Sequence, residues 1–327
     1  MLFLLYVTAI TYFFAIILTK RKEKTLLWIG IILTLSPLFF IKYAGFVNES
    51  FKDGMALIGV DINVSTTSFI MPLGISFFTF QALGYLIDTY NQKIEAEKNW
   101  WCYMLFVGFF PQIASGPINR ADSLLPQIKD KRDFDQVQAI QGLKWLLWGM
   151  FMKVVMADRI GLYLDVIFNN YQHHSGLSCM LGIFLYSFQI YGDFAGYSFM
   201  ALGVGKLFGF ELVNNFGRPY FSQSITEFWH RWHISLSTWL RDYVYIPLGG
   251  SRCRRIRNYW NIIVTFLVSG IWHGANWTYI VWGLIHGLLQ VVEKMLGLQR
   301  SSGAILIKML RIVCVFLFIL KSATYRV

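Results

Sequence analysis

Long apolar runs separated by short polar stretches dominate this chain. Residues 2–19 are nearly all apolar and end at a basic cluster, residues 20–24. Further apolar runs cover residues 26–47, 69–87, 137–157, 178–200, 259–272, 275–296 and 303–320. A helix of about 20 apolar residues is long enough to cross the hydrocarbon core of a bilayer. The pattern predicts an all-α, polytopic integral membrane protein with about eight to ten membrane segments.

Residues 101–118 are apolar but contain Pro111, Gln112, Gly116 and Pro117. Such a mixture predicts a re-entrant or broken helix, because irregular backbone at membrane depth must be buried in protein or line a cavity. The basic residues 20–24 should face the cytoplasm by the positive-inside rule. Residues 48–68 carry nearly balanced charge, so we expect an external loop there.

Composition supports this membrane interpretation. Of 327 residues, 56% are apolar and 14% charged, whereas soluble domains have about 25% charged residues. These figures exclude a disordered chain and argue against a soluble globular enzyme. The four scattered cysteines indicate neither a disulfide framework nor a zinc site. No basic stretch precedes residues 2–19, so we expect them to remain as a span rather than be cleaved as a signal peptide. With no long linker or repeat, residues 1–327 are predicted to form one membrane domain.

The densest group of ionisable residues lies between residues 218 and 242. Ser224 and Glu227 form a capping-box pattern, which predicts a helix start. A helix continuing from there would place one polar stripe along its side, formed by His230, His233 and Ser237. The stripe fits an interfacial amphipathic helix equally well. Metal binding is a weaker alternative, because no second ligand cluster accompanies the histidines.

His273 lies inside an otherwise apolar run. On a continuous helix, Ser269, His273 and Asn276 would share one face. An imidazole buried there is favoured in its neutral form, and a neutral imidazole can accept a proton from a hydroxyl as a general base. A histidine that only forms hydrogen bonds between helices explains the position equally well. His286 lies on a different face from His273, and we predict a structural role for it.

Other charged groups have less specific explanations. His173 and His174 are predicted to lie in a solvated loop. Asp193 fits a structural hydrogen bond or a substrate path equally well. The strongest basic cluster follows residues 247–250 and should face the cytoplasm; it comprises Arg252, Arg254, Arg255 and Arg257. It is most simply a topology determinant, with anionic lipid headgroups or the phosphates of an acyl donor as alternative partners.

Six segments together resemble the membrane-bound O-acyltransferase family, within its bacterial branch of alginate O-acetylation and teichoic-acid D-alanyl transfer proteins. They are residues 72–81 (PLGISFFTFQ), 110–118 (FPQIASGPI), 231–237 (RWHISLS), 239–243 (WLRDY), 245–250 (YIPLGG) and 272–274 (WHG). The resemblance runs from about residue 1 to 320. It implies helices around a central tunnel in the bacterial cytoplasmic (inner) membrane. It also implies that His273 is catalytic and that His233 lines the same chamber.

The implied reaction moves an acyl group from a cytoplasmic thioester donor, acetyl-CoA or an acyl carrier protein, to a hydroxyl. The acceptor would be an extracytoplasmic polysaccharide, as in alginate O-acetylation, or a partner protein of the extracytoplasmic SGNH acetyltransferase type. We expect no tightly bound cofactor, no metal and no nucleic acid, and we expect membrane lipid around the chain. Substrate contacts are predicted for four further residues: Ser237, Arg241, Asp242 and Asn276.

Three alternatives stay open at this point. The first is D-alanyl transfer to teichoic acid. The second is a transporter or flippase for lipid-linked glycans, in which polar residues would line a permeation path. The third is a degenerate, noncatalytic copy, since the resemblance implies further hydrophobic segments before and after the ones here. The resemblance also implies an Arg at the position of His230, a departure that leaves His233 and residues 239–242 intact.

Overall fold

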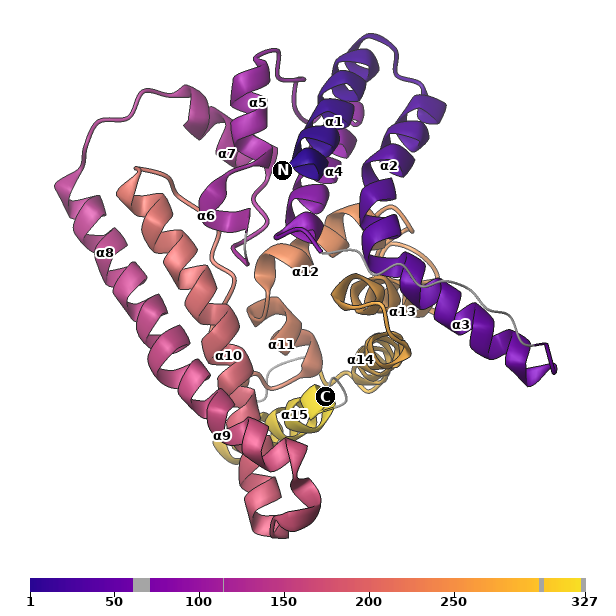
Figure 1. The fold of residues 1–327 in the computed structure, drawn as a ribbon, viewed down its shortest axis with the longest axis vertical. Coiled ribbons are helices and arrows are strands. Elements are labelled where there is room, and N and C mark those ends of the chain that lie inside the picture. Colours follow the sequence, from indigo (N-terminus) through magenta and orange to yellow (C-terminus); the bar gives the residue numbers. More distant parts are fainter. Residues whose placement is uncertain (61–70, 114, 300–302, 325–327) are drawn as a thin grey trace. The chain divides into compact units, whose positions relative to one another are not determined.

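A computed structural model describes residues 1–60, 71–113, 115–299 and 303–324, and these residues are mostly helical (Figure 1). Within these ranges the only β pairing is an isolated antiparallel bridge between Phe216 and Trp232. The predicted all-α class is confirmed for this part of the chain. The helices form two compact units that alternate along the sequence. The first comprises Met1–Ala114, Ile118–Lys131 and Ile271–Trp277, and the second comprises Ser115–Pro117, Arg132–Gly270 and Thr278–Val327.

The first unit begins with two long helical stretches. Helix α1 covers Leu2–Lys20, and α2 (Lys24–Leu38) continues through a π-helical turn, η1 (Phe39–Tyr43), into α3 (Ala44–Leu57). The prediction of a loop is therefore wrong for residues 48–57, which are helical. Residues 58–60 are not helical, as the prediction requires. No proline interrupts α3, and its polar residues lie within a helical pattern rather than in a turn. Residues 61–70 of the predicted loop lie outside the described residues.

Helix α4 (Ile75–Tyr90) packs against α1 and α2. It begins after Gly74, whose φ is +73°. A Cβ at this position would lie 2.1 Å from the carbonyl oxygen of Ile113. The described part of the apolar run predicted at residues 69–87, from residue 71 onward, becomes helical at Ile75, because Gly74 allows a tight turn against the segment around Ile113.

The predicted break in residues 101–118 is confirmed. Helix α5 covers Trp100–Val107, a short helix α6 covers Phe110–Ile113, and α7 covers Ala121–Lys129. A chain of buried amides supports the break: Gln112 donates to the side-chain oxygen of Gln81, and Asn119 donates to Gln112 at 2.5 Å. Gln81 itself donates to the carbonyl of Phe106 at 2.6 Å. Buried polar groups need such partners where the backbone leaves the helix.

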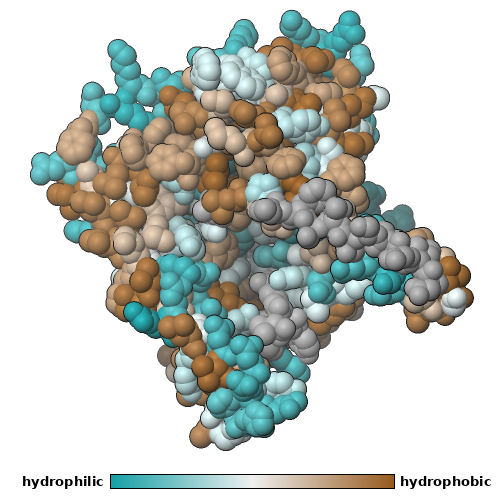
Figure 2. Space-filling model, viewed as in Figure 1, coloured by the Kyte–Doolittle hydropathy of each residue, from teal (hydrophilic) through white to brown (hydrophobic). Residues whose placement is uncertain are grey.

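The second unit contains the longest helices. Helix α8 (Gln136–Met150), a π-helical segment η2 (Phe151–Ala157) and α9 (Asp158–Asn169) form one continuous stretch, which packs along α10 (Gly176–Leu207). The runs predicted at residues 137–157 and 178–200 are thus helical, but the helices extend beyond them. In Figure 2 the surface over α8 is mostly hydrophobic, and Leu143, Leu147 and Trp148 of this helix are exposed. Such a surface suits contact with lipid.

Short helices follow α10 in sequence. They are η4 (Pro219–Phe221), α11 (Ile225–Arg231), α12 (Ile234–Leu240) and η5 (Arg241–Tyr245). Before α10 there is one short 3-10 turn, η3 (Tyr171–His173). Three longer helices complete the described chain: α13 (Arg255–His273), α14 (Trp277–Met295) and α15 (Ile305–Thr324). They agree closely with the apolar runs predicted at residues 259–272, 275–296 and 303–320.

Two helical stretches among the described residues are long and apolar enough to cross a membrane: Leu2–Lys20 and Lys24–Leu57. The larger number of membrane segments expected from the sequence stays a prediction, as do the central tunnel and the single membrane domain.

Candidate functional site

The chain bends sharply at His233. Helix α11 ends at Arg231, and α12 begins at Ile234, with His233 in the left-handed conformation between them at φ 47° and ψ 53°. The predicted single stripe of His230, His233 and Ser237 is therefore wrong. A left-handed backbone is uncommon for a non-glycine residue, although histidine adopts it more readily than most. Such strained residues cluster at functional sites.

The side chain of His233 is 1% exposed. Its ring meets that of Phe194 edge-on, with the ring centres 4.6 Å apart. The following backbone is held by Asn215, whose carbonyl accepts the amide of Ile234 at 3.0 Å and whose side-chain oxygen accepts the amide of Ser235 at 3.2 Å. Contacts within the second unit thus fix the bend and the ring.

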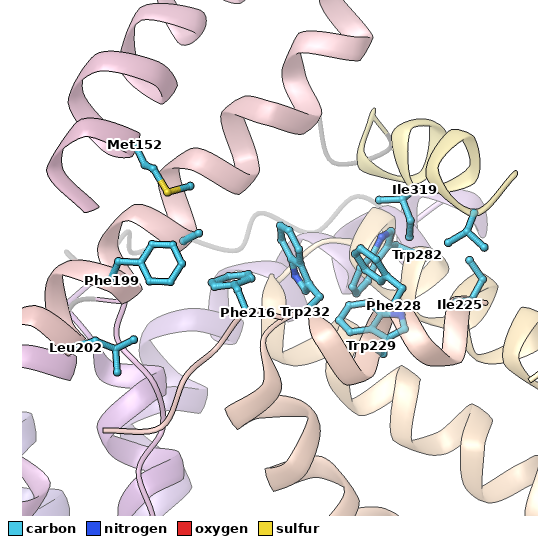
Figure 3. Close-up of a cluster of buried hydrophobic side chains, with 12 residues drawn as sticks. Met152, Phe199, Leu202, Phe216, Ile225, Phe228, Trp229, Trp232, Trp282 and Ile319 are labelled. Atoms are coloured by element: carbon cyan, nitrogen blue, oxygen red, sulfur yellow. The ribbon is translucent and has the colours of Figure 1, made fainter. Parts of the chain in front are cut away.

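Aromatic side chains pack on the α11 side of this bend (Figure 3). The ring centres of Phe216 and Trp232 are 5.1 Å apart, and those of Phe228 and Trp232 are 5.5 Å apart and stacked. Trp229 and Trp282 extend the cluster toward α14. Large buried rings have few rotameric alternatives and pack densely, so these contacts hold α11 in a fixed position within the second unit.

Two carboxylates and a hydroxyl fix the beginning of α11. The hydroxyl of Ser224 accepts the amide of Glu227 at 2.9 Å, as the capping box predicts. The Glu227 carboxylate accepts the amide of Gln223 at 2.7 Å rather than that of Ser224, and it also pairs with Arg231. From α14, Glu293 accepts the amide of Thr226 at 3.0 Å and its hydroxyl at 2.9 Å. This helix end is therefore attached to α14.

A cavity of about 270 Å³ lies beside α11 and α12 in the second unit. Of the predicted residues, Ser237 and Arg241 line it, and His230 also reaches it. Ser269 of α13 contributes to the wall. The remaining wall is mostly apolar; it includes Trp229, Ile234, Leu236, Leu240, Ile262 and Phe266. Ligand sites commonly combine an apolar lining with a few placed polar groups.

The charged side chains on the cavity wall are basic. Lys294 donates to the side-chain oxygen of Asn258 at 2.5 Å, and Asn258 in turn donates to the hydroxyl of Tyr245 at 2.6 Å. Burial raises the pKa of Tyr245, so its phenol is neutral at ordinary pH. Arg241 pairs with neighbouring Asp242 at 2.8 Å. Among the described lining residues there is no carboxylate, so the wall favours an anion or an electron-rich group.

His273 ends α13, and its last turn belongs to the first unit. The side chain is half-buried, and its ring lies 5.0 Å from that of Trp272. Trp272 packs against Phe77 and Phe80 of α4, with ring-centre distances of 5.7 and 5.6 Å. Beyond the helix end, the indole of Trp277 donates to the hydroxyl of Ser50 at 3.2 Å. The segment around His273 is thus bound to α3 and α4.

The structure separates the predicted site residues into different environments. Asn276 is exposed in the turn after α13, so the predicted shared face of Ser269, His273 and Asn276 is wrong for Asn276. Asp242 forms an ion pair with Arg241, and its predicted contact with substrate stays a prediction. Within the second unit, Ser237 and Arg241 lie at the cavity, and His233 lies at the bend that precedes α12.

The remaining histidines and Asp193 take structural positions. His286 is 1% exposed and accepts a hydrogen bond from the indole of Trp229 at 3.2 Å. His173 and His174 lie in an exposed turn, as predicted. Asp193 of α10 pairs with Lys153 of η2 at 2.5 Å, which favours the structural alternative for this carboxylate.

Sequence reasoning missed two lysines that the structure brings to notable places. Lys294 reaches the cavity, and Lys42 lies against the end of α13. A cation inside an apolar stretch is a signal that marks Lys42. The same signal applies to Lys294, which lies near the end of the apolar run at residues 275–296. The described residues contain no group of three or more His, Cys, Asp or Glu side chains able to hold a metal ion.

Known proteins resemble this chain over most of its length. The model of the membrane-bound O-acyltransferase family matches residues 99–305. A probable alginate O-acetylase of Pseudomonas syringae is 40% identical over 86% of this chain and 54% of its own length. A peptidoglycan O-acetyltransferase of Helicobacter pylori is 38% identical over 84% and 57%, and a teichoic acid D-alanyltransferase of Streptococcus thermophilus is 30% identical over 84% and 65%.

The chain therefore spans about half the length of the alginate O-acetylase relatives that it matches. The family match covers more than half of the chain, and it includes the bend at His233, the cavity and His273. The resemblance inferred from the sequence motifs is confirmed, and the chain belongs to the membrane-bound O-acyltransferase family.

Proposed function

We propose that the protein is an O-acyltransferase that moves an acetyl group from a cytoplasmic thioester donor to a hydroxyl. The acceptor would be an extracytoplasmic polysaccharide or a partner protein of the SGNH acetyltransferase type. The 40% identity to a probable alginate O-acetylase over 86% of the chain carries this proposal. It also favours an acetyl group over D-alanine, because the teichoic acid D-alanyltransferase is only 30% identical.

In this proposal His273 acts as the general base. Its neutral imidazole would remove the proton from the acceptor hydroxyl as the oxygen attacks the thioester carbonyl. The tetrahedral intermediate would then collapse, and the donor would leave as a thiolate that takes up the proton. His233 would position a group or share the developing charge, since its ring is held rigidly at the bend.

We assign the cavity beside α11 and α12 to the acyl donor. Acetyl-CoA and acyl carrier proteins both present a thioester on a long arm with a phosphate at its far end. The cavity offers an apolar wall for the arm and two cationic side chains, Arg241 and Lys294, for phosphate. The hydroxyls of Ser237 and Ser269 can donate to polar groups along the arm.

Acetyl transfer by the purified full chain in lipid vesicles tests the proposal. Labelled acetyl-CoA or acetylated carrier protein is supplied with mannuronate oligosaccharides, and ester-bound label is measured by mass spectrometry. Removal of a general base should lower the rate about 100- to 10,000-fold in His273→Gln. The matched control, His173→Gln, changes an exposed histidine and should leave the rate unaltered.

Three outcomes would contradict the proposal. Undiminished transfer by correctly inserted His273→Gln protein would exclude this histidine as the base. Oligosaccharide that crosses the vesicle membrane without gaining an ester would indicate the transporter alternative. Transfer of D-alanine from its carrier protein, but not of acetyl, would assign the chain to the D-alanyl reaction.

A further inference from the structure

Two neighbouring side chains bind the end of the helix that carries His273. The ammonium group of Lys42 donates to the carbonyl oxygen of Trp272 and, at 3.4 Å, to that of His273. The hydroxyl of Tyr43 donates to the carbonyl oxygen of Ile271 at 2.8 Å. Three successive carbonyls at the end of α13 thus have donors from two successive residues, and all of these groups belong to the first unit.

The end of a helix needs such donors. Its last four carbonyls have no partner inside the helix, and the aligned peptide dipoles place a partial negative charge there. Where water is scarce, an unsatisfied carbonyl is costly. A lysine ammonium satisfies both needs at once, because it supplies hydrogen-bond donors and a positive charge.

Lys42 occupies a costly position for a cation. It lies in the apolar stretch Lys24–Leu57, one of the two stretches long and apolar enough to span a membrane. Ionisable residues at such positions are rare and usually functional. Its ammonium also lies 5.6 Å from the ring centre of Tyr43 and 5.7 Å from that of Trp272, within the range of cation–π attraction. The carbonyls of Trp272 and His273 and these two aromatic rings are therefore the groups that contact the charge.

The backbone around Lys42 is adapted to this contact. Residues Phe39–Tyr43 form a π-helical turn between α2 and α3. A π turn spreads over more residues than an α turn, so successive side chains point in more similar directions. Lys42 and Tyr43 can consequently reach the same helix end. Such turns often occur at functional sites.

We propose that Lys42 is a positioning residue for His273. By binding the carbonyls of Trp272 and His273, it fixes the last turn of α13 and with it the direction of the imidazole. The proposal rests on the assignment of His273 as the general base. It adds that a charge on η1 controls the geometry of that base.

The test compares Lys42→Met, which removes the charge at similar length, with Lys42→Arg, which keeps it. The matched control is Lys52→Met, which changes an exposed lysine of α3. We expect Lys42→Met to lower kcat about tenfold to hundredfold, because misplacement of a catalytic group by about 1 Å has an effect of this size. The KM for the donor should stay unchanged. Lys42→Arg should restore most of the rate, and Lys52→Met should equal the wild type.

A second measurement does not depend on catalysis. Diethyl pyrocarbonate acylates accessible neutral imidazoles, and mass spectrometry gives the rate at each histidine. In Lys42→Met the rate at His273 should rise, because the loosened helix end exposes the ring more often. The rates at His173 and His174 should stay constant and serve as internal references.

The outcomes separate this proposal from the proposed function. If Lys42→Met keeps the wild-type kcat and the wild-type His273 modification rate, Lys42 does not position His273. If His273→Gln remains active, the proposed role of His273 as general base fails. The diethyl pyrocarbonate modification rate of His273 in Lys42→Met then shows by itself whether Lys42 positions the His273 ring. If Lys42→Met does not insert, Tyr43→Phe removes a single donor and should cause a smaller loss of kcat in the same direction. Wild-type kcat and modification rate in Tyr43→Phe would then overturn the proposal.

Discussion

Asn215 binds the backbone that directly follows His233. Its carbonyl and its side-chain oxygen accept the amides of Ile234 and Ser235, and its side-chain amide donates to the hydroxyl of Ser198 at 3.1 Å. The left-handed conformation of His233 costs energy relative to a helical one. The fully buried Asn215 compensates for this cost by giving two amides of the bend partners that a regular helix would have supplied.

Replacement of Asn215 by alanine should destabilise the bend. Asn215→Ala leaves the buried amide of Ser235 without its acceptor, so the free energy of unfolding should fall by about 1–3 kcal/mol. Thermal unfolding in detergent measures the change. Asn214→Ala is the matched control, because Asn214 is exposed and accepts only the amide of Phe216. Equal melting temperatures for the two variants would show that the bend does not depend on Asn215.

Glycine at position 233 separates the role of the backbone from that of the ring. His233→Gly should be about 1 kcal/mol more stable than His233→Ala, because glycine adopts a left-handed conformation without steric cost. Both variants should lose at least about tenfold in transfer rate if the imidazole contributes to the reaction. A His233→Gly protein with wild-type activity would mean that position 233 serves only to bend the chain.

The sequence was sufficient to predict most helices and the broken segment, because long apolar runs and the Pro111 and Pro117 signals are local. The Ser224 capping hydrogen bond was also predictable from spacing. The bend at His233 was not, since neither proline nor glycine marks it. It depends on Asn215, a residue of the preceding loop that only the fold brings beside it.

In the candidate site, too, the features that depend on residues distant in sequence were not predictable. Arg241 and Ser237 were predicted to contact substrate, and the fold places both at the cavity. Asn276 was predicted by extending the helical period past His273, but the helix ends there because the chain turns into α14. Helix ends depend on partners outside the helix, and the partner here is Lys42, far away in sequence.

The basic side chains of the cavity should determine donor affinity. Arg241→Gln and Lys294→Met should each raise the KM for acetyl-CoA by about tenfold, since a charge-assisted hydrogen bond contributes about 1.5–3 kcal/mol and part of it is screened by water. Their kcat should change less than their KM. Initial rates over a range of acetyl-CoA concentrations measure both values. The control Lys308→Gln changes an exposed lysine of α15, and a KM change as large as that of Lys294→Met would indicate a nonspecific charge effect.

Close packing of α8 and α10 should make Gly203 sensitive to a single methyl group. A Cβ at Gly203 would lie 2.5 Å from the amide nitrogen of Leu146 and 2.7 Å from the carbonyl oxygen of Gly142. Gly203→Ala should therefore lower the free energy of unfolding by about 1–3 kcal/mol through overpacking. Gly176→Ala, at the open start of α10, has nothing within 4 Å and should be neutral or slightly stabilising. Thermal melting of both variants measures the change in stability. Equal destabilisation of the two variants would contradict the close approach of α8 and α10 at Gly203.

Cysteine labelling tests which ends of the helices face the cytoplasm. The positive-inside rule places residues 20–24 and the arginine cluster of residues 252–257 on the cytoplasmic side. The exposed position Arg21 lies in the first segment, and the exposed Ser251 directly precedes the second. Glu49 lies on α3, toward the other end of the stretch that begins at Lys24. Single cysteines are introduced at these three positions after the four native cysteines are replaced by serine.

With a maleimide that cannot cross membranes, Glu49→Cys should react in intact cells, because α2 carries the chain across the bilayer before α3 begins. Arg21→Cys and Ser251→Cys should react only after the cells are permeabilised. Reaction of Ser251→Cys in intact cells would place the arginine cluster outside. A thioester donor supplied from the cytoplasm would then approach from the face opposite to the cluster, and the cluster could no longer contribute to its binding.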